Sequence, residues 1–543
     1  MKALEFLSAA ELATPVQSRH LTAPVSVQQS LPSTAQLLVE GGDARITLDP
    51  DRAVNTYGCQ PFPDPELLAF GSSTASVISA AGFAAAEQLR RRLLRNADSE
   101  APTVTYAREL ERVRRELLHL CGVSDLPGVE LVFAASGTDL HLIAAQLAGG
   151  SAALPTRVIM VDAAETGSQV PAALAGRHFS SRAALGDVVN AGTAISGGAA
   201  LEVVTVAVRD SEGGARQPAA VDTEVETLAT AAVARGQRVL LILVDISKTG
   251  LIAPSPACVL ALRQRFAENI DVLVDACQFR IAPSTLRAYL EHGFMLALTG
   301  SKFVTGPTFA GALLFPAAVA QRLRRQPFPQ SLRSYSTQAD WPKNWATAGI
   351  LNPVANYGLL LRWEAALQEL RSLRAVPEAK ITRFLQDFAS AVRNRLNNDA
   401  CLAPLPVPSI DRRPLIATTS WDPIQTIFPF LLSHPETSAG KMPLSIHETQ
   451  EVYRLLQIDL SNHPGLGIIG SPDDCAALRC QLGQPVVCGT RDGMPVSALR
   501  LCASARLVVA ATAQHGAKRT AVIAEAMAVL DKAAWLVRTA FFR

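Results

Sequence analysis

The fold is indicated most clearly by residues 270–316, which read IDVLVDACQFRIAPSTLRAYLEHGFMLALTGSKFVTGPTFAGALLFP. Three segments in this stretch, IDVLVDA, FMLALTG and GALLFP, are apolar and have the length of buried strands. One lysine, Lys302, lies between the last two of them. An ammonium group beside apolar strands is costly unless it is paired or used covalently. The position of Lys302 therefore needs a chemical explanation.

Apolar segments of strand length also occur earlier in the chain, from Val129 onward. The segments VELVFAA, RVIMVDA, LEVVTVAV and RVLLILVDI also have strand length, and TEVETLATAAVARG and SPACVLALRQRFAEN have the pattern of helical connections. Near-continuous apolar strands that alternate with helices are typical of parallel sheets covered by helices. The sequence therefore predicts an α/β domain with a mostly parallel, seven-stranded sheet.

The flanking regions differ from this pattern. Residues 1–48 are rich in Ser, Thr, Gln, Pro and Ala and are expected to form a loosely structured arm. Helical spacing follows in residues 78–96 and 105–123, where Gly122 is the expected stop, and returns in residues 352–374 and 519–541. We divide the chain into an N-terminal arm and helical segment (1–104), a large α/β domain (105–352) and a smaller C-terminal α+β domain (353–543).

Composition narrows the class of protein. Of the 543 residues 49% are hydrophobic and 18% charged, and the net charge of +2 gives no argument for a nucleic-acid partner. No apolar run reaches membrane-spanning length, and the first residues lack the core of a signal peptide. The nine cysteines and the histidines show no metal-ligand spacing, so no metal is expected. We expect a cytoplasmic protein that acts on a small molecule.

Ligands of open α/β sheets bind beyond the carboxyl ends of the strands. Alone, each polar strand end has an ordinary explanation: SGTD (136–139) as a helix cap, Asp245 as a loop exit, Asp275 as a cap or ion pair, and Lys302 as a solvated lysine. Together they provide an anion site at a helix N-terminus, a strand-end carboxylate and a partly buried lysine. These are the parts needed to hold pyridoxal phosphate.

The segments VDACQ and TGSKFVTGPTFAGALLF resemble fold-type I pyridoxal-phosphate enzymes, and most closely the branch of class V aminotransferases and cysteine desulfurases. The resemblance covers roughly residues 105–320. It implies an aspartate-aminotransferase-like large domain and a homodimer with its sites at the subunit interface, where Thr305 or Thr308 reaches the phosphate of the neighbouring subunit.

The resemblance also implies roles for individual residues. Lys302 would form the internal aldimine and move the substrate α-proton, Asp275 would pair with the pyridinium nitrogen, and Gln278 would donate to the phenolate oxygen. The phosphate would be held at the helix N-terminus and beside the lysine. The expected cofactor-binding residues are Ser136, Gly137, Thr138, Thr166, Asp245, Ser247, Asp275, Gln278, Thr299, Ser301, Lys302 and Thr308.

Two departures from the family pattern argue against desulfurase chemistry. Thr166 follows Glu165 where many relatives have a histidine stacked on the cofactor, and Ser301 precedes the lysine where desulfurases have a histidine. A desulfurase also needs a reactive cysteine on an exposed loop, for which Cys401 is the candidate. Cys277 is expected to point away from the cofactor.

Two residues are candidates for binding the substrate. By resemblance Arg500 matches the arginine that grips a substrate carboxylate, although a surface arginine on a strand is an equal alternative. Tyr57 is expected at the entrance of the site, with an ordered structural wrap as the simpler account of its segment.

The resulting hypothesis is a transferase or lyase that binds an amino acid as an external aldimine and forms an α-carbanion or quinonoid. We favour elimination or replacement at the β- or γ-carbon of an activated amino acid, for instance S-adenosylmethionine. An aminotransferase is the main alternative. A desulfurase-like lyase ranks lower because of the departures at Thr166 and Ser301. A non-catalytic relative also ranks lower, because it has little reason to retain Lys302, Asp275 and Gln278 together.

Overall fold

The structure, a computed structural model, describes residues 31–539 except 98, 150–153, 418–419, 436–441, 462–472 and 514–516. Its large sheet has the strand order β2-β9-β8-β7-β5-β3-β4, and the short β6 (Ile252–Ala253) pairs with β5. The seven strands of this path are β2 (Glu130–Ala134), β3 (Thr156–Val161), β4 (Leu201–Val206), β5 (Val239–Asp245), β7 (Ile270–Ala276), β8 (Met295–Thr299) and β9 (Gly311–Phe315). Each corresponds to a segment predicted from the sequence.

The middle of the sheet is parallel. β3 runs parallel to β4 and β5, and β7 to β5 and β8, whereas β9 is antiparallel to β8 and β2. All residues of β2, β5, β7, β8 and β9 are buried, as expected for strands covered on both faces. The predicted α/β class with a mostly parallel sheet is therefore confirmed.

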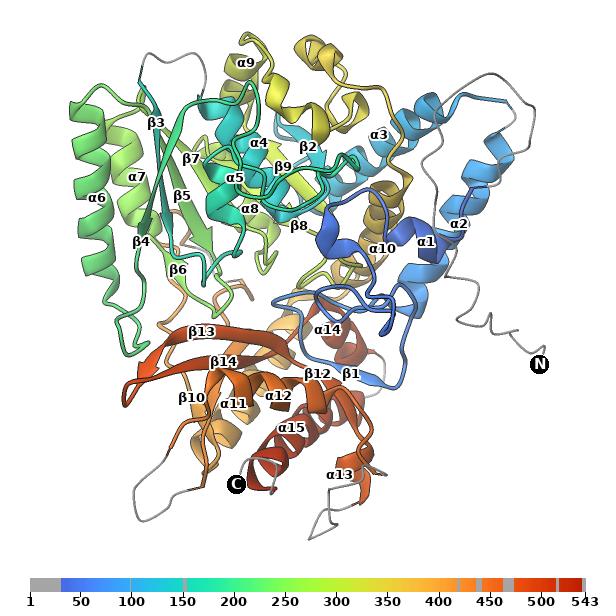
Figure 1. The fold of residues 1–543 in the computed structure, drawn as a ribbon, viewed down its shortest axis with the longest axis vertical. Coiled ribbons are helices and arrows are strands. Elements are labelled where there is room, and N and C mark those ends of the chain that lie inside the picture. Colours follow the sequence, from blue (N-terminus) through green and yellow to red (C-terminus); the bar gives the residue numbers. More distant parts are fainter. Residues whose placement is uncertain are drawn as a thin grey trace.

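Helices cover this sheet (Figure 1). α6 (Pro218–Ala234) and α7 (Pro256–Arg265) lie side by side against the strands, and α4 (Gly137–Gly149) packs on β2, β8 and β9. The other helices of this region are α5 (Val170–Leu174), α8 (Pro283–Glu291) and α9 (Ala317–Arg324), with short 3-10 turns η3 (Gln330–Ser334), η4 (Gln338–Asp340) and η5 (Ala346–Ile350).

The described residues of the N-terminal segment, from Leu31 onward, form defined structure, so the expectation of a loose arm is wrong for them. α1 (Thr34–Leu38) packs on α10 (Tyr357–Arg374). The reason is Arg362, a fully buried residue of α10, which donates to the backbone carbonyl oxygens of Leu38 at 3.2 Å and Gly41 at 2.7 Å. These carbonyls therefore need no water, and the segment is fixed to the large domain. Residues 1–30 of the predicted arm lie outside the described residues.

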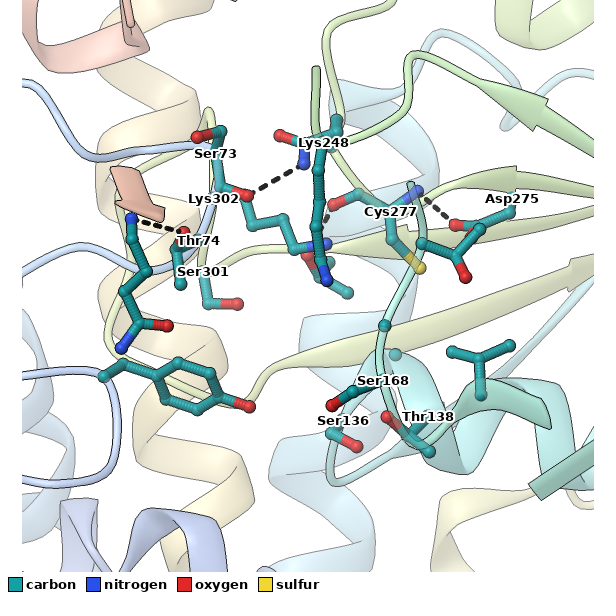
Figure 2. A pocket seen from close by; sticks show the side chains of 18 of the residues that line it. Ser73, Thr74, Ser136, Thr138, Ser168, Lys248, Asp275, Cys277, Ser301 and Lys302 are labelled. Carbon is teal, nitrogen blue, oxygen red and sulfur yellow. Dashed lines mark hydrogen bonds between the residues drawn. The ribbon is translucent and has the colours of Figure 1, made fainter. Parts of the chain in front are cut away.

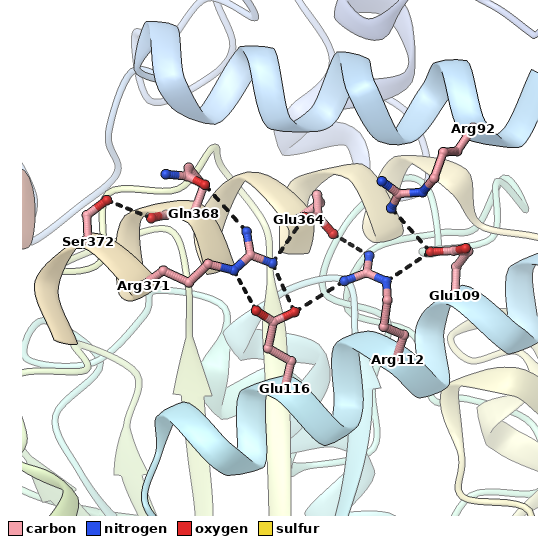
Figure 3. Close-up of polar contacts among 8 residues, drawn as sticks. All are labelled: Arg92, Glu109, Arg112, Glu116, Glu364, Gln368, Arg371 and Ser372. Atoms are coloured by element: carbon pink, nitrogen blue, oxygen red, sulfur yellow. Dashed lines mark hydrogen bonds and ion pairs between the residues drawn. The ribbon is translucent and has the colours of Figure 1, made fainter. Parts of the chain in front are cut away.

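Two long helices connect the N-terminal segment to α10. α2 (Ala80–Asn96) and α3 (Pro102–Leu120) both pack on it, and α3 ends where predicted, just before Gly122, which has a positive φ of 69°. Figure 3 shows the polar layer between α3 and α10, in which Arg371 bonds Glu116 at 2.9 Å and Glu364 at 3.2 Å.

The C-terminal part forms a smaller α+β unit, as predicted. Its antiparallel sheet has the order β10-β11-β14-β13, and β12 pairs in parallel with β1 of the N-terminal segment. The strands are β1 (Leu67–Ala69), β10 (Leu402–Pro404), β11 (Ile427–Leu432), β12 (Arg479–Gln481), β13 (Gly483–Arg491) and β14 (Met494–Cys502). The helices are α11 (Glu378–Asn397), α12 (Ile446–Leu456), α13 (Asp473–Ala477), α14 (Ala505–Thr512) and α15 (Ala517–Arg538).

The domain boundaries and the homodimer stay predictions. Among the described residues, no helix has both the length and the apolar character that crossing a membrane requires.

Candidate active site

The carboxyl ends of β2, β5, β7 and β8 open onto one cavity (Figure 2). Gly137 follows β2, Lys248 follows β5, Cys277 follows β7 and Lys302 follows β8, and all four line it. The N-terminal segment and β13 complete the walls, for example through Tyr57. The cavity therefore lies where parallel strands place their ligands, between the large sheet and the smaller unit.

One end of the cavity is built to receive an anion. α4 begins at Gly137, so its first N–H groups have no acceptor within the helix. A Cβ atom on Gly137 would lie 3.0 Å from the Cys277 sulfur, so only glycine leaves this surface open. Arg45, on the 3-10 turn η2 (Ala44–Ile46), donates to the hydroxyls of Thr138 at 3.1 Å and Ser136 at 3.3 Å. It brings a guanidinium group to the helix N-terminus.

Two acidic residues stand behind this anion site. Asp43 forms an ion pair with Arg45 at 2.5 Å. Asp139 accepts from the Ser136 N–H at 2.9 Å, and burial together with Asp43 raises its pKa to about 7. Because a large fraction of Asp139 is protonated at neutral pH, it opposes a bound anion less than an ordinary carboxylate does.

A buried carboxylate lies deeper in the cavity. Asp275, near the end of β7, accepts from the Cys277 N–H at 3.1 Å, and its Oδ2 lies 3.3 Å from Nε2 of His141. Nδ1 of His141 lies 2.7 Å from the Gly137 carbonyl oxygen, so α4 fixes the ring. Burial raises the pKa of Asp275, but His141 and Lys302 together lower it more. The resulting pKa of Asp275 is below the usual value for an aspartate. Asp275 is therefore a permanent negative charge in the cavity.

Two lysines enter the cavity. Figure 2 shows the side chains of Lys302 and Lys248 reaching into it from the ends of β8 and β5, the two strands on either side of β7. Across the described ranges, neither amine has a hydrogen bond or an ion pair within 4.0 Å. Burial, Arg500 and Lys302 lower the pKa of Lys248 to about 7. Both amines are thus available for chemistry.

Arg500 on β14 is a buried guanidinium whose hydrogen-bond partners are all neutral. It donates to the Lys248 carbonyl at 3.3 Å, to the Thr74 hydroxyl at 2.9 Å and to the Gln484 carbonyl. Burial lowers its pKa. Since no carboxylate of the described chain pairs with it, Arg500 is a suitable site for the carboxylate of a ligand.

The loop after β3 forms another wall. Glu165 accepts from Arg209 at 2.7 Å and from Ser247 at 2.6 Å, which joins this loop to the loop after β5. Thr166 and Gly167 line the cavity beside it, and the buried Thr166 hydroxyl has no hydrogen-bond partner. Small side chains thus stand where the family resemblance places a histidine.

No family model matches the chain, and no curated protein matches it. Among solved structures it is similar to the cystine C-S lyase C-DES in complex with its product cysteine persulfide, with 14% identity, a TM-score of 0.48, and 85% of this chain and 97% of that chain covered. It is also similar to the cysteine desulfurase CsdA from Escherichia coli, at 14% identity, a TM-score of 0.47, and 85% and 94% covered. It is similar as well to serine palmitoyltransferase from S. paucimobilis, solved with a bound PLP-myriocin aldimine. The identity is 13%, the TM-score is 0.47, and 86% of this chain and 88% of that chain are covered. Identities this low do not transfer residues or chemistry, so the fold class rests on the chain's own strand order.

Most residues predicted from the sequence come together in the cavity. Those that line it are Tyr57, Ser136, Gly137, Thr138, Thr166, Asp275, Gln278, Thr299, Ser301, Lys302, Thr308 and Arg500. Their roles stay predictions. The Gln278 amide donates to the Ser73 carbonyl at 2.9 Å, so it fixes the N-terminal segment at the cavity.

Asp245 and Ser247 do not line the cavity. Asp245 pairs with Arg412 at 2.6 Å and accepts from the Tyr289 hydroxyl at 2.8 Å. Ile246, which follows it, has a positive φ of 64°, so the backbone turns and brings Ile246 and Lys248 to the cavity instead. Ser247 bonds Glu165 and supports the loop.

The two cysteines singled out from the sequence also differ from expectation. Cys277 lines the cavity rather than pointing away, because β7 ends at Ala276 and strand alternation ends with it. Cys401 is fully buried at the start of β10. All nine cysteines are described, and each is buried or partly buried.

The cavity residues that sequence reasoning missed include the polar side chains of Arg45, His141, Lys248 and Gln484. Only Lys248 had a local signal, since it lies in the polar loop DISKTG that follows an apolar strand. His141 is one helical turn beyond Gly137, on the same side of α4.

Proposed function

We propose that the protein is a pyridoxal-phosphate-dependent enzyme, a transferase or lyase, that acts on an amino acid. One observation carries this proposal: the partnerless Lys302 amine shares a cavity with a helix N-terminal anion site and with an ionised, buried Asp275. Each group alone is ordinary. Together they match three functional parts of the cofactor: an aldehyde that binds an amine, a phosphate anion and a basic ring nitrogen.

The residues present fit this group. Gly137 keeps the phosphate surface open, and Ser136, Thr138 and Arg45 supply hydroxyl and guanidinium donors around it. The buried, unpartnered hydroxyls of Thr166 and Ser73 face the same space. Buried polar atoms without partners are rare unless a ligand or water satisfies them. Asp275 would hold the protonated ring nitrogen, and Lys302 would bind the aldehyde carbon.

The chain's own residues then divide the chemistry. When bound, pyridoxal phosphate supplies an electron sink for the pair left on the substrate's α-carbon. With the substrate bound, the Lys302 amine would take the proton from that carbon. Asp275 keeps its negative charge because its pKa lies below the usual value, and so it stabilises a positive charge opposite. Arg500 binds the α-carboxylate and Tyr57, from the N-terminal segment, borders the substrate.

For the bond that changes next, we propose elimination or replacement at the β- or γ-carbon, with aminotransfer as the alternative. Desulfurase chemistry is less suited to this chain, because none of its nine cysteines is exposed. A thiol that attacks a substrate sulfur must be accessible and easily ionised. Burial instead raises the pKa of the cavity thiol Cys277 and of the core thiol Cys480. A purely structural relative would have no use for partnerless amines in a cavity.

The first experiment is the visible absorption spectrum of the purified protein with added pyridoxal phosphate, before and after borohydride reduction. We expect a yellow band that reduction converts into a stable label on the Lys302 peptide. Lys302→Ala should lack the band, and Lys380→Ala, a change at an exposed lysine of α11, should keep it. Absence of the band in the wild type, or its persistence in Lys302→Ala, would refute the proposal.

Product analysis separates the two reactions. Aminotransfer yields a keto acid and the amine form of the cofactor, whereas elimination or replacement regenerates the aldehyde form. Analytical ultracentrifugation tests the homodimer that we propose as the working unit.

A further inference from the structure

Lys248 is held in the cavity by a rigid loop. Its N–H donates to the Glu165 carbonyl at 2.8 Å and its carbonyl accepts from Arg500 at 3.3 Å. The next residue, Thr249, is buried and bonds the Glu165 carboxylate. With its backbone held on both sides, Lys248 extends its side chain into the same cavity as Lys302 (Figure 2).

The charged groups facing Lys248 come from four elements. Arg500 on β14 and Lys302 after β8 disfavour its protonated form, whereas Glu165 after β3 and Asp275 on β7 favour it. The cavity also contains His141, Tyr57, Cys277 and Arg45. Burial is the largest influence, and the pKa of about 7 means that both the amine and the ammonium form are available near neutral pH.

A structural lysine in the same protein has different surroundings. Lys532 on α15 is fully buried, and its amine donates to the backbone carbonyl oxygens of Ile458 at 2.9 Å and of Leu456 and Ala476 at 3.5 Å. Lys248 has no such acceptors among the described residues, although it is partly buried and lines a polar cavity. The fold satisfies the buried Lys532 amine fully but leaves the partly exposed Lys248 amine without a partner in the described chain, which favours a role in chemistry over a role in packing.

We propose that Lys248 is a second proton-transfer group, which protonates the leaving group while Lys302 removes the α-proton. This inference rests on the proposed function and explains how one cavity serves two reacting atoms. In a β-elimination, the Lys302 amine takes the proton from Cα. The electron pair of that C–H bond becomes the second bond between Cα and Cβ, and the bond from Cβ to the leaving group breaks. The Lys248 ammonium donates a proton to the leaving group. Lys302 thus gains one proton and Lys248 loses another, so the total charge of the two lysines is unchanged.

The first test measures the amine itself and needs no cofactor. The full-length protein is treated with trace acetic anhydride between pH 5 and 10, and peptide mass spectrometry follows each lysine, with Lys380 as the exposed reference. We expect a midpoint near pH 7 for Lys248 and a higher midpoint in Lys302→Ala, because that variant lacks a neighbouring cation. A Lys248 midpoint equal to that of Lys380 would overturn the proposal.

The second test separates the two proton transfers. Amino acids are offered in deuterated water to the protein loaded with pyridoxal phosphate, and NMR follows α-proton exchange and product release. In Lys248→Met and Lys248→Arg we expect exchange within about threefold of wild type and elimination slower by roughly 10²-fold or more, the usual contribution of a general acid. Lys380→Met should match the wild type in both.

Other outcomes would contradict a proton-transfer role. Wild-type elimination in Lys248→Arg would mean that only the positive charge matters, and parallel loss of exchange and elimination with a normal cofactor band would make Lys248 a positioning residue. A wild type that only transaminates would also overturn it. If no cofactor band forms, the proposed function fails, while the acetylation midpoint still reports on Lys248.

Discussion

Substitution of Gly300 tests how the lysine loop is held. Gly300 directly follows β8 and lies two residues before Lys302, and a Cβ atom there would come within 2.6 Å of the Ala366 Cβ on α10. Its next contacts, with Ala310 Cβ and Trp363 Cζ3 at 3.4 Å, are ordinary ones. The clash in Gly300→Ala therefore involves essentially one atom, and removal of that atom in Ala366→Gly should relieve it.

The magnitudes follow from this geometry. Overpacking a core costs roughly 1–3 kcal/mol. Ala366→Gly costs about 1 kcal/mol, as glycine does in a helix interior. Since the double variant has no clash, its destabilisation should be close to that of Ala366→Gly alone, which gives a coupling of about 1–3 kcal/mol. Gly349→Ala, with no atom within 4 Å of the new Cβ, is the control and should change stability little.

Urea unfolding of the wild type, Gly300→Ala, Ala366→Gly and the double variant, followed by circular dichroism, measures the coupling. Borohydride labelling provides a local readout, because a displaced loop should reduce labelling of Lys302 in Gly300→Ala and restore it in the double variant. If the two destabilisations add to within about 0.5 kcal/mol, the contact between Gly300 and Ala366 does not position the loop.

Three further changes test the site. Arg45→Met should weaken pyridoxal phosphate binding by about 10- to 100-fold in a spectral titration, since a hydrogen bond to a charged group contributes about 1.5–3 kcal/mol; unchanged affinity would remove Arg45 from the anion site. Arg362→Met should destabilise the protein by roughly 3 kcal/mol and admit proteases near Gly41, because buried carbonyl groups lose their donor; resistance equal to wild type would contradict this. Asp139 has a raised pKa, so its contribution to stability is full below pH 4 and is lost as the pH rises through about 7; Asp139→Asn should flatten the unfolding free energy in this window, and an unchanged slope would argue against the shift.

The strands and their ends were predictable because both signals are local. Buried parallel strands need continuous apolar runs, and a polar residue directly after such a run lies at the edge where ligands bind. This logic brought Gly137, Asp275 and Lys302 together correctly, although 165 residues separate the first from the last. It failed at Asp245, because the positive φ of Ile246 redirects the chain and no sequence pattern indicates that turn.

The N-terminal wall of the site was not predictable in the same way. Arg45 bonds Thr138 across 93 positions, and Gln484 lies on β13 of the smaller unit, so neither has neighbours in sequence that relate to the cavity. Composition suggested a loose arm because the segment is polar and short of apolar periodicity. The described part of this arm, within residues 1–48, is held instead by the buried Arg362, and the segment that follows it is held by Arg280, which bonds the Ser72 hydroxyl at 2.8 Å. Tertiary contacts of this kind leave no periodic trace in the sequence.

The charges of the cavity also limit the side chains that suit the proposed amino-acid substrate. Lys248 and Arg500 are both cationic groups without a carboxylate partner in the described chain, and a substrate α-carboxylate neutralises only Arg500. A sulfonium side chain, as in S-adenosylmethionine, would bring another positive charge into the cavity that Lys248 lines, and like charges repel in a site of low dielectric constant. Neutral or acidic side chains avoid this repulsion, so they suit the cavity better than the sulfonium example.

S-Methylmethionine and methionine form a matched pair for this prediction, because they differ by one methyl group and one charge. At pH 6, where Lys248 is mostly protonated, the sulfonium compound should bind Lys302→Ala loaded with pyridoxal phosphate at least tenfold more weakly than methionine. The difference should shrink when Lys248→Met is added to Lys302→Ala, because this change removes the positive charge. Equal affinities at pH 6, or a difference that persists in Lys248→Met, would mean that Lys248 does not face the substrate side chain.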